Sequence, residues 1–293
     1  MNRAMSSLAM SASLVLASCA GGPPLSKGKP FDLTPPQQRL APGIQFSQRL
    51  WPGPVPMQVS IVEVDLTTRD LGLVVGGIAA DAKGEYLSRT TSSFVRDTGA
   101  VVAINGGYFS PVVNAEGQAL DAIGFSKSGG LLQSPPNTAQ TAGMATAVVC
   151  FKRREIAILA TFSCPDRFTD GLAAGPILVA AGKVVTDVKN TTRHPRSAIG
   201  MNARGDRLWL ITIDGRQPGY SEGASFEETA RILVALGATE ALNLDGGGST
   251  ALVARDGSGK PRQLNRPIQG GVPGRERPVA NHIGVFELSR PIR

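Results

Sequence analysis

Residues 208–250 constrain the fold more than any other part of the chain, because three elements follow one another there at short spacing. Leu208–Ile213 has the composition and alternation of a strand. A helix is predicted over residues 226–236, since the capping box Ser225–Glu228 precedes its apolar face. A second short strand, Ala241–Leu244, follows. If the two strands of this β-α-β unit are parallel, the loops after them leave the same edge of the sheet.

Both of these strands lead into polar loops. The first loop begins with Asp214-Gly-Arg216, and the second is Asn243–Thr250, which contains Asp245, Gly246, Gly247, Gly248 and Ser249. Glycines let a ligand approach the backbone closely, and successive N–H groups in such a turn can bind an anion. The sequence therefore predicts a polar site that includes Asp214 and Asp245. A tight hairpin in which Asp245 is an Asx-turn residue is the alternative.

The composition indicates a globular chain rich in turns and strands. Hydrophobic residues make up 42% of the 293 residues, and there are 35 Gly and 21 Pro but little helical periodicity. Further strands are predicted at 59–64, 71–75, 100–104, 175–179 and 283–288, with a helix at 88–98. We expect a loop over 166–174.

The net charge of +7 is compatible with anionic partners, but the pattern does not favour nucleic acid. The basic residues are scattered apart from the run Lys152–Arg154, and only three Tyr and two Trp are available to stack on bases. We therefore expect no nucleic-acid partner.

The N-terminus is typical of a bacterial lipoprotein. Arg3 precedes the apolar stretch Leu8–Leu16, which is too short to span a bilayer, and Leu16-Ala-Ser-Cys19 resembles a lipobox. We expect a signal peptide over 1–19, lipidation of Cys19, and an extracytoplasmic protein anchored in the bacterial envelope. A cleaved signal peptide without a lipid is the alternative. The prolines of residues 20–56 predict an extended tether, and the folded domain is expected at 57–293.

The two remaining cysteines, Cys150 and Cys164, have a spacing that would let a disulfide close a hairpin, and an oxidising compartment favours that bond. Two buried free thiols are the alternative. A zinc site is not expected, because His194 and His282 are the only histidines and neither lies in a cluster of ligands.

Two other segments carry candidate binding residues. Asn105 and Gly106 follow the predicted strand 100–104, and the amide of Asn105 could bind a ligand hydroxyl or phosphate, although a turn residue would look the same. Tyr108 and Phe109 are expected in the core. Arg196 could clamp a phosphate or carboxylate in bidentate fashion, or form an ordinary surface ion pair.

Taken in order, several motifs resemble those of the phosphodiester glycosidase family, which includes the enzyme that removes N-acetylglucosamine from a phosphodiester. They are Asn105–Phe109, Arg196–Gly200, Asp214–Arg216, Asn243–Thr250 and Arg277–Val285. The resemblance covers about residues 55–288. It implies an α+β fold, a single mixed β-sheet-rich domain with a few short helices. It also implies a hydrolase that cleaves the glycosidic bond of a sugar-1-phosphodiester or a related envelope glycan.

The resemblance assigns roles to the loop residues. Asp245 is the first candidate, and Asp214 the second, for the carboxylate that attacks the anomeric carbon or activates water. Arg196 and Arg216 would hold the phosphodiester anion. The residues expected to line the substrate are Asn105, Gly106, Arg196, Arg216, Asn243, Gly246, Gly247, Gly248, Ser249, Asn281 and His282.

Other interpretations remain open on these residues. Asp214 and Asp245 could also hold a divalent cation, although no cofactor is certain. A conventional glycoside hydrolase acting on envelope polysaccharide, or a glycan-binding surface lipoprotein without activity, are the alternative functions.

Overall fold

The computed structural model describes residues 37–51, 55–79, 85–138, 140, 143–186 and 191–288. They belong to one compact unit, Phe31–Arg293. The predicted signal peptide and Cys19 lie outside the described residues. Within the described ranges, no helix is long and apolar enough to cross a membrane.

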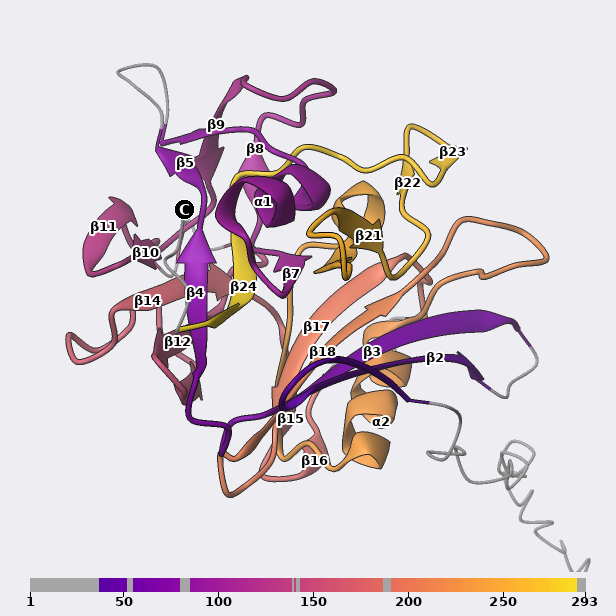
Figure 1. The fold of residues 1–293 in the computed structure, drawn as a ribbon, viewed down its shortest axis with the longest axis horizontal. Helices are drawn as coiled ribbons and strands as arrows, with labels where there is room; N and C mark the ends of the chain where they lie inside the picture. Colours follow the sequence, from indigo (N-terminus) through magenta and orange to yellow (C-terminus); the bar gives the residue numbers. More distant parts are fainter. Residues whose placement is uncertain are drawn as a thin grey trace, which may run out of the picture. The chain divides into compact units, whose positions relative to one another are not determined.

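Most of the described chain is built from β-strands, arranged in three larger sheets (Figure 1). The eight-stranded sheet has the order β1 (Gln38–Ala41), β2 (Ile44–Trp51), β3 (Met57–Asp65), β18 (Arg207–Ile213), β17 (Arg196–Met201), β19 (Glu240–Asn243), β15 (Ile177–Ala180) and β16 (Lys183–Val184). One five-stranded sheet has the order β11 (Leu131–Ser134), β10 (Ser126–Ser128), β14 (Asp170–Ala174), β12 (Ala147–Lys152) and β13 (Glu155–Leu159). The other contains β21 (Pro261–Gln263), β20 (Leu252–Arg255), β7 (Val102–Asn105), β24 (His282–Glu287) and β4 (Leu71–Gly76).

Smaller elements complete the fold. A four-stranded sheet contains β5 (Ile78–Ala79), β6 (Tyr86–Leu87), β9 (Ala119–Ala122) and β8 (Phe109–Ser110), and β22 (Ile268–Gln269) pairs with β23 (Val272–Pro273). The helices are α1 (Thr91–Thr98), α2 (Phe226–Leu236) and the short 3-10 helix η1 (Gly247–Ser249). All pairings between these named strands are antiparallel, so the mixed sheet that the resemblance implied is wrong, while a sheet-rich single domain is confirmed.

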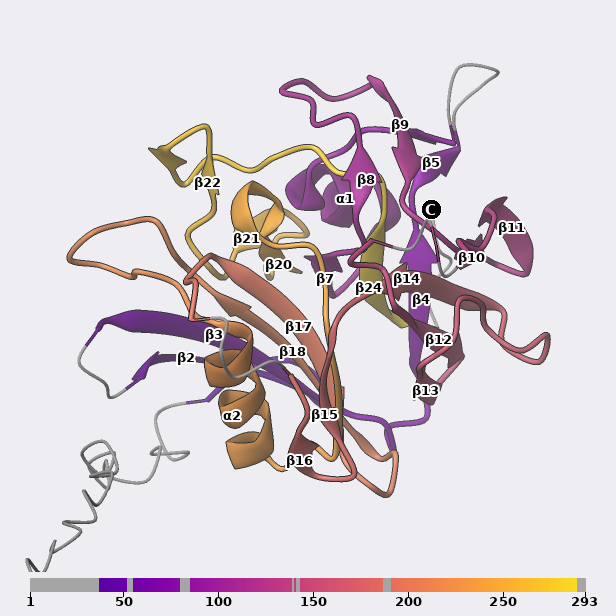
Figure 2. The same cartoon turned by 180° about the vertical axis from the view of Figure 1, so that it is seen from behind.

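The predicted β-α-β unit is present, with one strand inserted between its two strands. Both β18 and β19 pair antiparallel with β17, so they run parallel to each other one strand apart. The loops that begin at Asp214 and Leu244 therefore leave the same edge of the eight-stranded sheet. Helix α2 lies against this sheet (Figure 2) and buries Ala230 and Leu233. Its N-terminus has the predicted capping box, and Gly237 ends it in the left-handed conformation.

The central core lies where the three larger sheets meet. Its buried apolar side chains come from strands of every one of these sheets, including Val62, Leu210, Ile283, Val149 and Leu252. Burial of such branched side chains from long-range strand pairs is the main driving force for assembly of the sheets.

The N-terminal boundary of the fold differs from the prediction. Residues 20–56 were expected to form a tether, but β1 and β2 extend the eight-stranded sheet, and β2 pairs with β3 from Ile44 opposite Val64 to Trp51 opposite Met57. The prolines at 42 and 52 lie outside β2 in the sequence, so the eight residues of β2 can alternate and pair. The loop expected over 166–174 is also wrong in part, because β14 occupies its second half.

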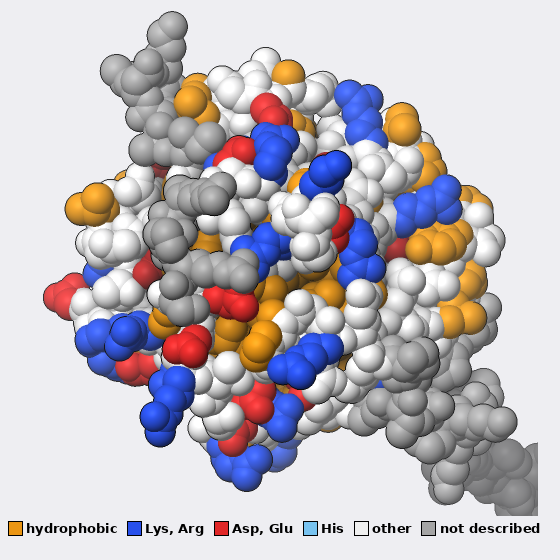
Figure 3. Space-filling view, viewed as in Figure 1, with side chains coloured by type: hydrophobic (Ala, Val, Ile, Leu, Met, Phe, Trp, Pro, Cys, Tyr) orange, Lys and Arg blue, Asp and Glu red, His pale blue; other side chains and the backbone are white. Residues whose placement is uncertain are grey.

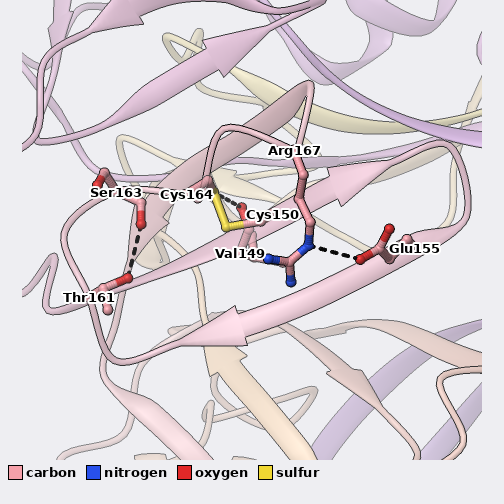
Figure 4. Close-up of a disulfide and its surroundings, with 7 residues drawn as sticks. All are labelled: Val149, Cys150, Glu155, Thr161, Ser163, Cys164 and Arg167. Atoms are coloured by element: carbon pink, nitrogen blue, oxygen red, sulfur yellow. Dashed lines mark hydrogen bonds and ion pairs between the residues drawn. A yellow bond between two sulfur atoms is a disulfide. The ribbon is translucent and has the colours of Figure 1, made fainter.

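Cys150 and Cys164 form the predicted disulfide (Figure 4), with Cα atoms 5.7 Å apart. Cys150 lies in β12, whose hairpin with β13 is followed by the segment that brings Cys164 back. Arg167, next to this segment, forms an ion pair with Glu155 at 3.3 Å. The covalent link therefore closes the hairpin onto the start of β14.

Candidate active site

The loop that follows β19 places Asp245 at the edge of the eight-stranded sheet. The backbone turns at once, because Gly246 N donates to Asp245 Oδ1 (2.8 Å) and Gly247 N donates to Pro195 O (2.9 Å). Gly247 has a positive φ of 62°, and a Cβ at Gly246 would lie 2.7 Å from Pro195 O. Only glycines fit this turn, which brings the loop against the start of β17.

The carboxyl of Asp245 is set to titrate near neutral pH. Burial raises its pKa to about 6, while a hydrogen bond with Ser249, the charge of Arg277 and the N–H of Gly246 act in the opposite direction. A carboxyl with these neighbours is still mostly ionised at pH 7 but binds a proton readily in mild acid. Such a group suits a base or a nucleophile.

Asn105 holds the Asp245 loop through its side-chain amide. Its Nδ2 donates to Asp245 O (2.7 Å), and its Oδ1 accepts from Ser197 Oγ (2.6 Å) and Ala251 N (3.2 Å). Asp245 N donates in turn to Gly106 O at 3.1 Å. Because the Asn105 side chain is buried and its amide is bonded on both sides, the predicted contact with a sugar hydroxyl gains no support.

Arg216 lies against the glycine turn from the side of β18. A Cβ placed on Gly247 would meet Arg216 Nη2 at 3.1 Å, so the guanidinium packs over this glycine. Arg216 is exposed, and its Nη2 lies 3.3 Å from His194 Nδ1. The pKa of His194 is lowered, first by burial and then by the charges of Arg196 and Arg216. His194 is therefore neutral at pH 7 beside a cation.

Arg277 lies against the same turn from the C-terminal segment. A Cβ on Gly248 would meet Arg277 Nη2 at 2.5 Å. The guanidinium donates from Nη1 to Ser249 Oγ (3.3 Å) and from Nε to Gln269 Oε1 (2.7 Å). Gln269 Nε2 donates further to Asn114 Oδ1 at 2.9 Å. Two guanidiniums thus flank the glycine turn that carries Asp245.

Arg196 is engaged by the protein itself. Its Nε donates to Ala224 O (2.9 Å), its Nη2 donates to Thr192 O (3.1 Å), and its guanidinium lies 4.0 Å from the centre of the Phe226 ring. Burial lowers its pKa to about 10, so it remains charged. The contacts make Arg196 a support for the loop before β17, and they do not support its predicted role as the main phosphate clamp.

Asp214 is a buried structural carboxylate. Asn265 Nδ2 donates to Oδ1 (2.9 Å), Arg266 N donates to Oδ1 (3.0 Å), and Tyr220 OH donates to Oδ2 (3.1 Å). Burial raises its pKa to about 6 against these donors. Asp214 and Asp245 leave the same sheet edge, as predicted, but their hydrogen bonds lead to different partners. The predicted catalytic role of Asp214 therefore gains no support.

The predicted cation site gains no support either. Both oxygens of Asp214 already accept hydrogen bonds, and among the described residues no three His, Cys, Asp or Glu side chains lie close enough to hold a metal ion. A divalent cation remains a prediction from the sequence alone.

The side chain of Asn243 links β19 to Gly175, which lies between β14 and β15. Its Nδ2 donates to Gly175 O (2.9 Å) and Tyr108 OH (3.0 Å), and Tyr108, which is buried as expected, donates to Gly175 O at 2.5 Å. These bonds place Asn243 beneath the site, where it fixes the end of β19.

The remaining predicted substrate contacts are core residues. Asn281 Oδ1 accepts from Gly107 N (3.0 Å), and a Cβ on Gly106 would clash with Asn281, so both serve the packing of β7 on β24. His282 is fully buried and stacks on Phe94 with ring centres 4.7 Å apart. Burial lowers its pKa to about 3, which leaves it neutral. The prediction that Asn281 and His282 line the site gains no support from these contacts.

Three residues at the site were not predicted as functional. Arg277 is the first residue of the C-terminal motif, so the motif itself was the signal that could have found it. The sequence shows His194 only as a histidine before Pro195 that lies outside any cluster of ligands. Gln269 gave no signal, because its contact with Arg277 forms between two loops whose geometry the sequence does not show.

The fold and the site define a β-sheet protein that presents one partly buried carboxylate on a glycine turn flanked by two guanidiniums, which is an arrangement for an anionic substrate. The family model for phosphodiester glycosidase matches residues 98–286. The chain belongs to the phosphodiester glycosidase family. No curated protein matches the sequence.

Solved structures share the fold at low sequence identity. A hypothetical protein from Synechocystis has 19% identity and a TM-score of 0.58, with 87% of this chain covered. This chain spans 64% of that protein, less than two thirds of its length. The catalytic domain of zebrafish N-acetylglucosamine-1-phosphodiester alpha-N-acetylglucosaminidase, auto-inhibited by its pro-peptide, has 17% identity and a TM-score of 0.56, with 89% and 86% of the two chains covered. A Burkholderia pseudomallei protein whose name describes it as exported has 17% identity and a TM-score of 0.56, with 80% and 75% covered.

Proposed function

We propose that this protein hydrolyses the glycosidic bond of a sugar-1-phosphodiester, or of a related anionic envelope glycan. The observation that carries the proposal is the position of Asp245 in a glycine turn flanked by Arg216 and Arg277. The family match supports a glycosidase-type hydrolase, and the anion-binding side chains favour a phosphodiester among its possible substrates.

The two arginines act on the leaving group. A phosphodiester carries one negative charge, and a second develops as the bond between the anomeric carbon and the phosphate oxygen breaks. Arg216 and Arg277 stabilise this growing charge more than the charge of the bound substrate, which is the condition for a rate effect. Because a phosphate monoester is a good leaving group, the reaction needs no strong general acid.

Asp245 acts at the anomeric carbon. At pH 7 it is mostly ionised, since its pKa is about 6. It either attacks the anomeric carbon or removes a proton from the water that does so. In both cases the bonding electrons of the broken C–O bond stay with the phosphate, and water supplies the oxygen of the released sugar.

The compartment is part of the proposal. The lipobox at Cys19 is a sequence prediction outside the described residues, and it would place the enzyme outside the cytoplasm on a bacterial membrane. Glycans of the cell envelope would then be the accessible substrates.

The full chain is tested on paired substrates, a sugar-1-phosphodiester and the matching nitrophenyl glycoside, over a panel of sugars. Asp245→Asn removes the carboxylate, and Arg216→Asn removes one cation. Arg153→Asn is the matched control, because Arg153 and Arg216 are both exposed and have φ angles of 56° and 57°. Asparagine tolerates this left-handed conformation, so the backbone is equally affected in both variants.

The expected result is turnover of the phosphodiester, lost in Asp245→Asn and reduced about 100-fold or more in Arg216→Asn, with Arg153→Asn at wild-type activity. Turnover of the neutral glycoside that survives Arg216→Asn would make the protein a conventional glycoside hydrolase. Binding of glycans across the panel without turnover of any substrate would make it a glycan-binding protein, and the proposal would be wrong.

A further inference from the structure

One end of the five-stranded sheet that contains the disulfide presents two hairpin turns side by side. Both β10 and β12 pair antiparallel with β14, so they run parallel and their turns leave the same end of the sheet. Gly130 N donates to Thr169 O (2.7 Å), and Thr169 N donates to Phe151 O (3.0 Å), which joins the two turns through the residue before β14. We call residues 127–132, 152–155 and 166–169 the hairpin end.

The hairpin end exposes two adjacent leucines. Leu131 is 70% exposed and Leu132 is 59% exposed, in the edge strand β11. Successive residues of a strand point to opposite faces, so apolar surface is present on both faces of this hairpin. A flat protein partner would cover one face, whereas an apolar medium that surrounds the turn would cover both.

Basic residues surround these leucines. The hairpin end holds five cations and two carboxylates: Lys127, Lys152, Arg153, Arg154 and Arg167 against Glu155 and Asp166. Glu155 pairs with Arg167, and the neighbouring Asp170 is buried and accepts from Gly129 N, so both of these carboxylates are engaged within the protein. Figure 3 shows apolar side chains at the left edge of the molecule, with Lys and Arg side chains and some Asp and Glu side chains below them.

A cavity of about 410 Å³ lies beside the second turn. It is lined by Arg69, Lys152, Arg153, Arg154, Glu155 and Leu288. Four of these six residues are cations, and the one carboxylate pairs with Arg167 outside the lining. A space of this charge and size fits a phosphate headgroup held next to apolar surface.

We propose that the hairpin end is a membrane contact that binds an anionic phospholipid surface. Leu131 and Leu132 enter the boundary between headgroups and acyl chains, and Lys152 and Arg153 bind headgroup phosphates. The predicted lipid at Cys19 would tether the chain to the same bilayer, although the proposal rests on the described residues and not on that lipid.

The test uses the unit Phe31–Arg293, which holds all the described strands, its own core and the disulfide, and carries no lipid. Binding to vesicles is measured by co-sedimentation, with phosphatidylglycerol mixed into phosphatidylcholine or with phosphatidylcholine alone. Leu131→Ser with Leu132→Ser removes the apolar surface. The matched control is Leu50→Ser, because Leu50 is 60% exposed but belongs to β2 of another sheet.

We expect binding to the anionic vesicles that is about tenfold weaker in the double leucine variant and unchanged in Leu50→Ser. Lys152→Glu with Arg153→Glu should weaken binding to anionic vesicles by about tenfold and should not affect the weaker binding to neutral ones. All these side chains are exposed, so thermal unfolding of the variants should match that of the wild type. In Leu131→Trp, vesicles should shift the tryptophan emission to shorter wavelengths.

Several outcomes would overturn the proposal. The first is the absence of vesicle binding by the wild-type unit, and the second is an equal loss in Leu50→Ser. Gel filtration without vesicles supplies the third, because a dimer that the double leucine variant dissociates would make the hairpin end an interface between copies of the chain.

Discussion

Substitution of Gly248 by alanine should misplace Arg277 without unfolding the protein. A Cβ at this position would lie 2.5 Å from Arg277 Nη2 and 2.7 Å from Arg277 Cζ, and it would also meet Gln269 Oε1. Real Cβ atoms do not approach other atoms so closely, so the guanidinium must move away by roughly 1 Å. The backbone of Gly248 has no positive φ, so alanine adds no conformational strain there.

The size of the effect follows from this displacement. A shift of about 1 Å in a group that stabilises the transition state can lower the rate about 100-fold. Arg277 also loses its short bond to Gln269, because both partners are pushed by the same methyl group. Overpacking of this kind destabilises a fold by about 1–3 kcal/mol, which a domain of this size should tolerate.

The assay is kcat/KM for the phosphodiester, with thermal unfolding measured on the same preparations. Gly257→Ala is the matched control, since a Cβ at Gly257 would meet nothing within 4 Å and its φ is also not positive. We expect the control to retain both activity and stability. Gly248→Ala should lose activity while it still unfolds cooperatively.

Wild-type activity in Gly248→Ala would refute the reasoning, because it would show that the position of Arg277 does not affect the reaction. A loss that is equal for the phosphodiester and for a neutral glycoside would also count against it. In that case the methyl group would act on Asp245 or on the turn and not on the cation.

Three further predictions concern other parts of the structure. Because burial raises the pKa of Asp245 to about 6, its carboxylate forms as the pH rises through that value. We therefore expect kcat/KM to rise with pH to a plateau above about pH 7, and we expect this rise to be absent in Asp245→Asn. Activity that falls above pH 6 would instead make Asp245 a general acid. Arg196→Ala should destabilise the fold by about 2–4 kcal/mol, because the Ala224 and Thr192 carbonyls each lose one hydrogen bond from a charged donor and Phe226 loses its cation. A change below about 0.5 kcal/mol in denaturant unfolding would contradict this. The double substitution Cys150→Ser with Cys164→Ser removes a disulfide between cysteines with a sequence separation of 14, and it should lower the free energy of unfolding by about 3 kcal/mol through chain entropy. The melting temperature of this variant should fall to that of the reduced wild-type protein.

Local sequence signals predicted the elements around the site well. The capping box at Ser225–Glu228 and the stop at Gly237 define α2 through hydrogen bonds within a few residues. The same holds for α1, where Thr90 caps the N-terminus and Gly99 ends the helix in the left-handed conformation. Such patterns were readable because every partner in them lies within one or two turns of chain.

Strand pairing was predicted less well, since the partners lie far apart in the sequence. β17 lies between β18 and β19 in the sheet, and no pattern within the β-α-β segment predicts this insertion. β2 was missed for a related reason, because the surrounding prolines outweighed eight residues whose alternation matters only once β3 lies beside them.

The sequence alone determined which residue types gather at the sheet edge, because local patterns predict the order of the strands, the helix and the glycine turn. Only the tertiary structure decided which of those residues are available for chemistry. Asn105 and Asp245 are separated by 140 positions, and the hydrogen bond between them engages the Asn105 amide within the protein. Arg277 replaces Arg196 beside the turn for the same kind of reason. Burial and hydrogen-bond partners depend on which distant segments meet, and that is a property of the packed chain and not of any stretch of it.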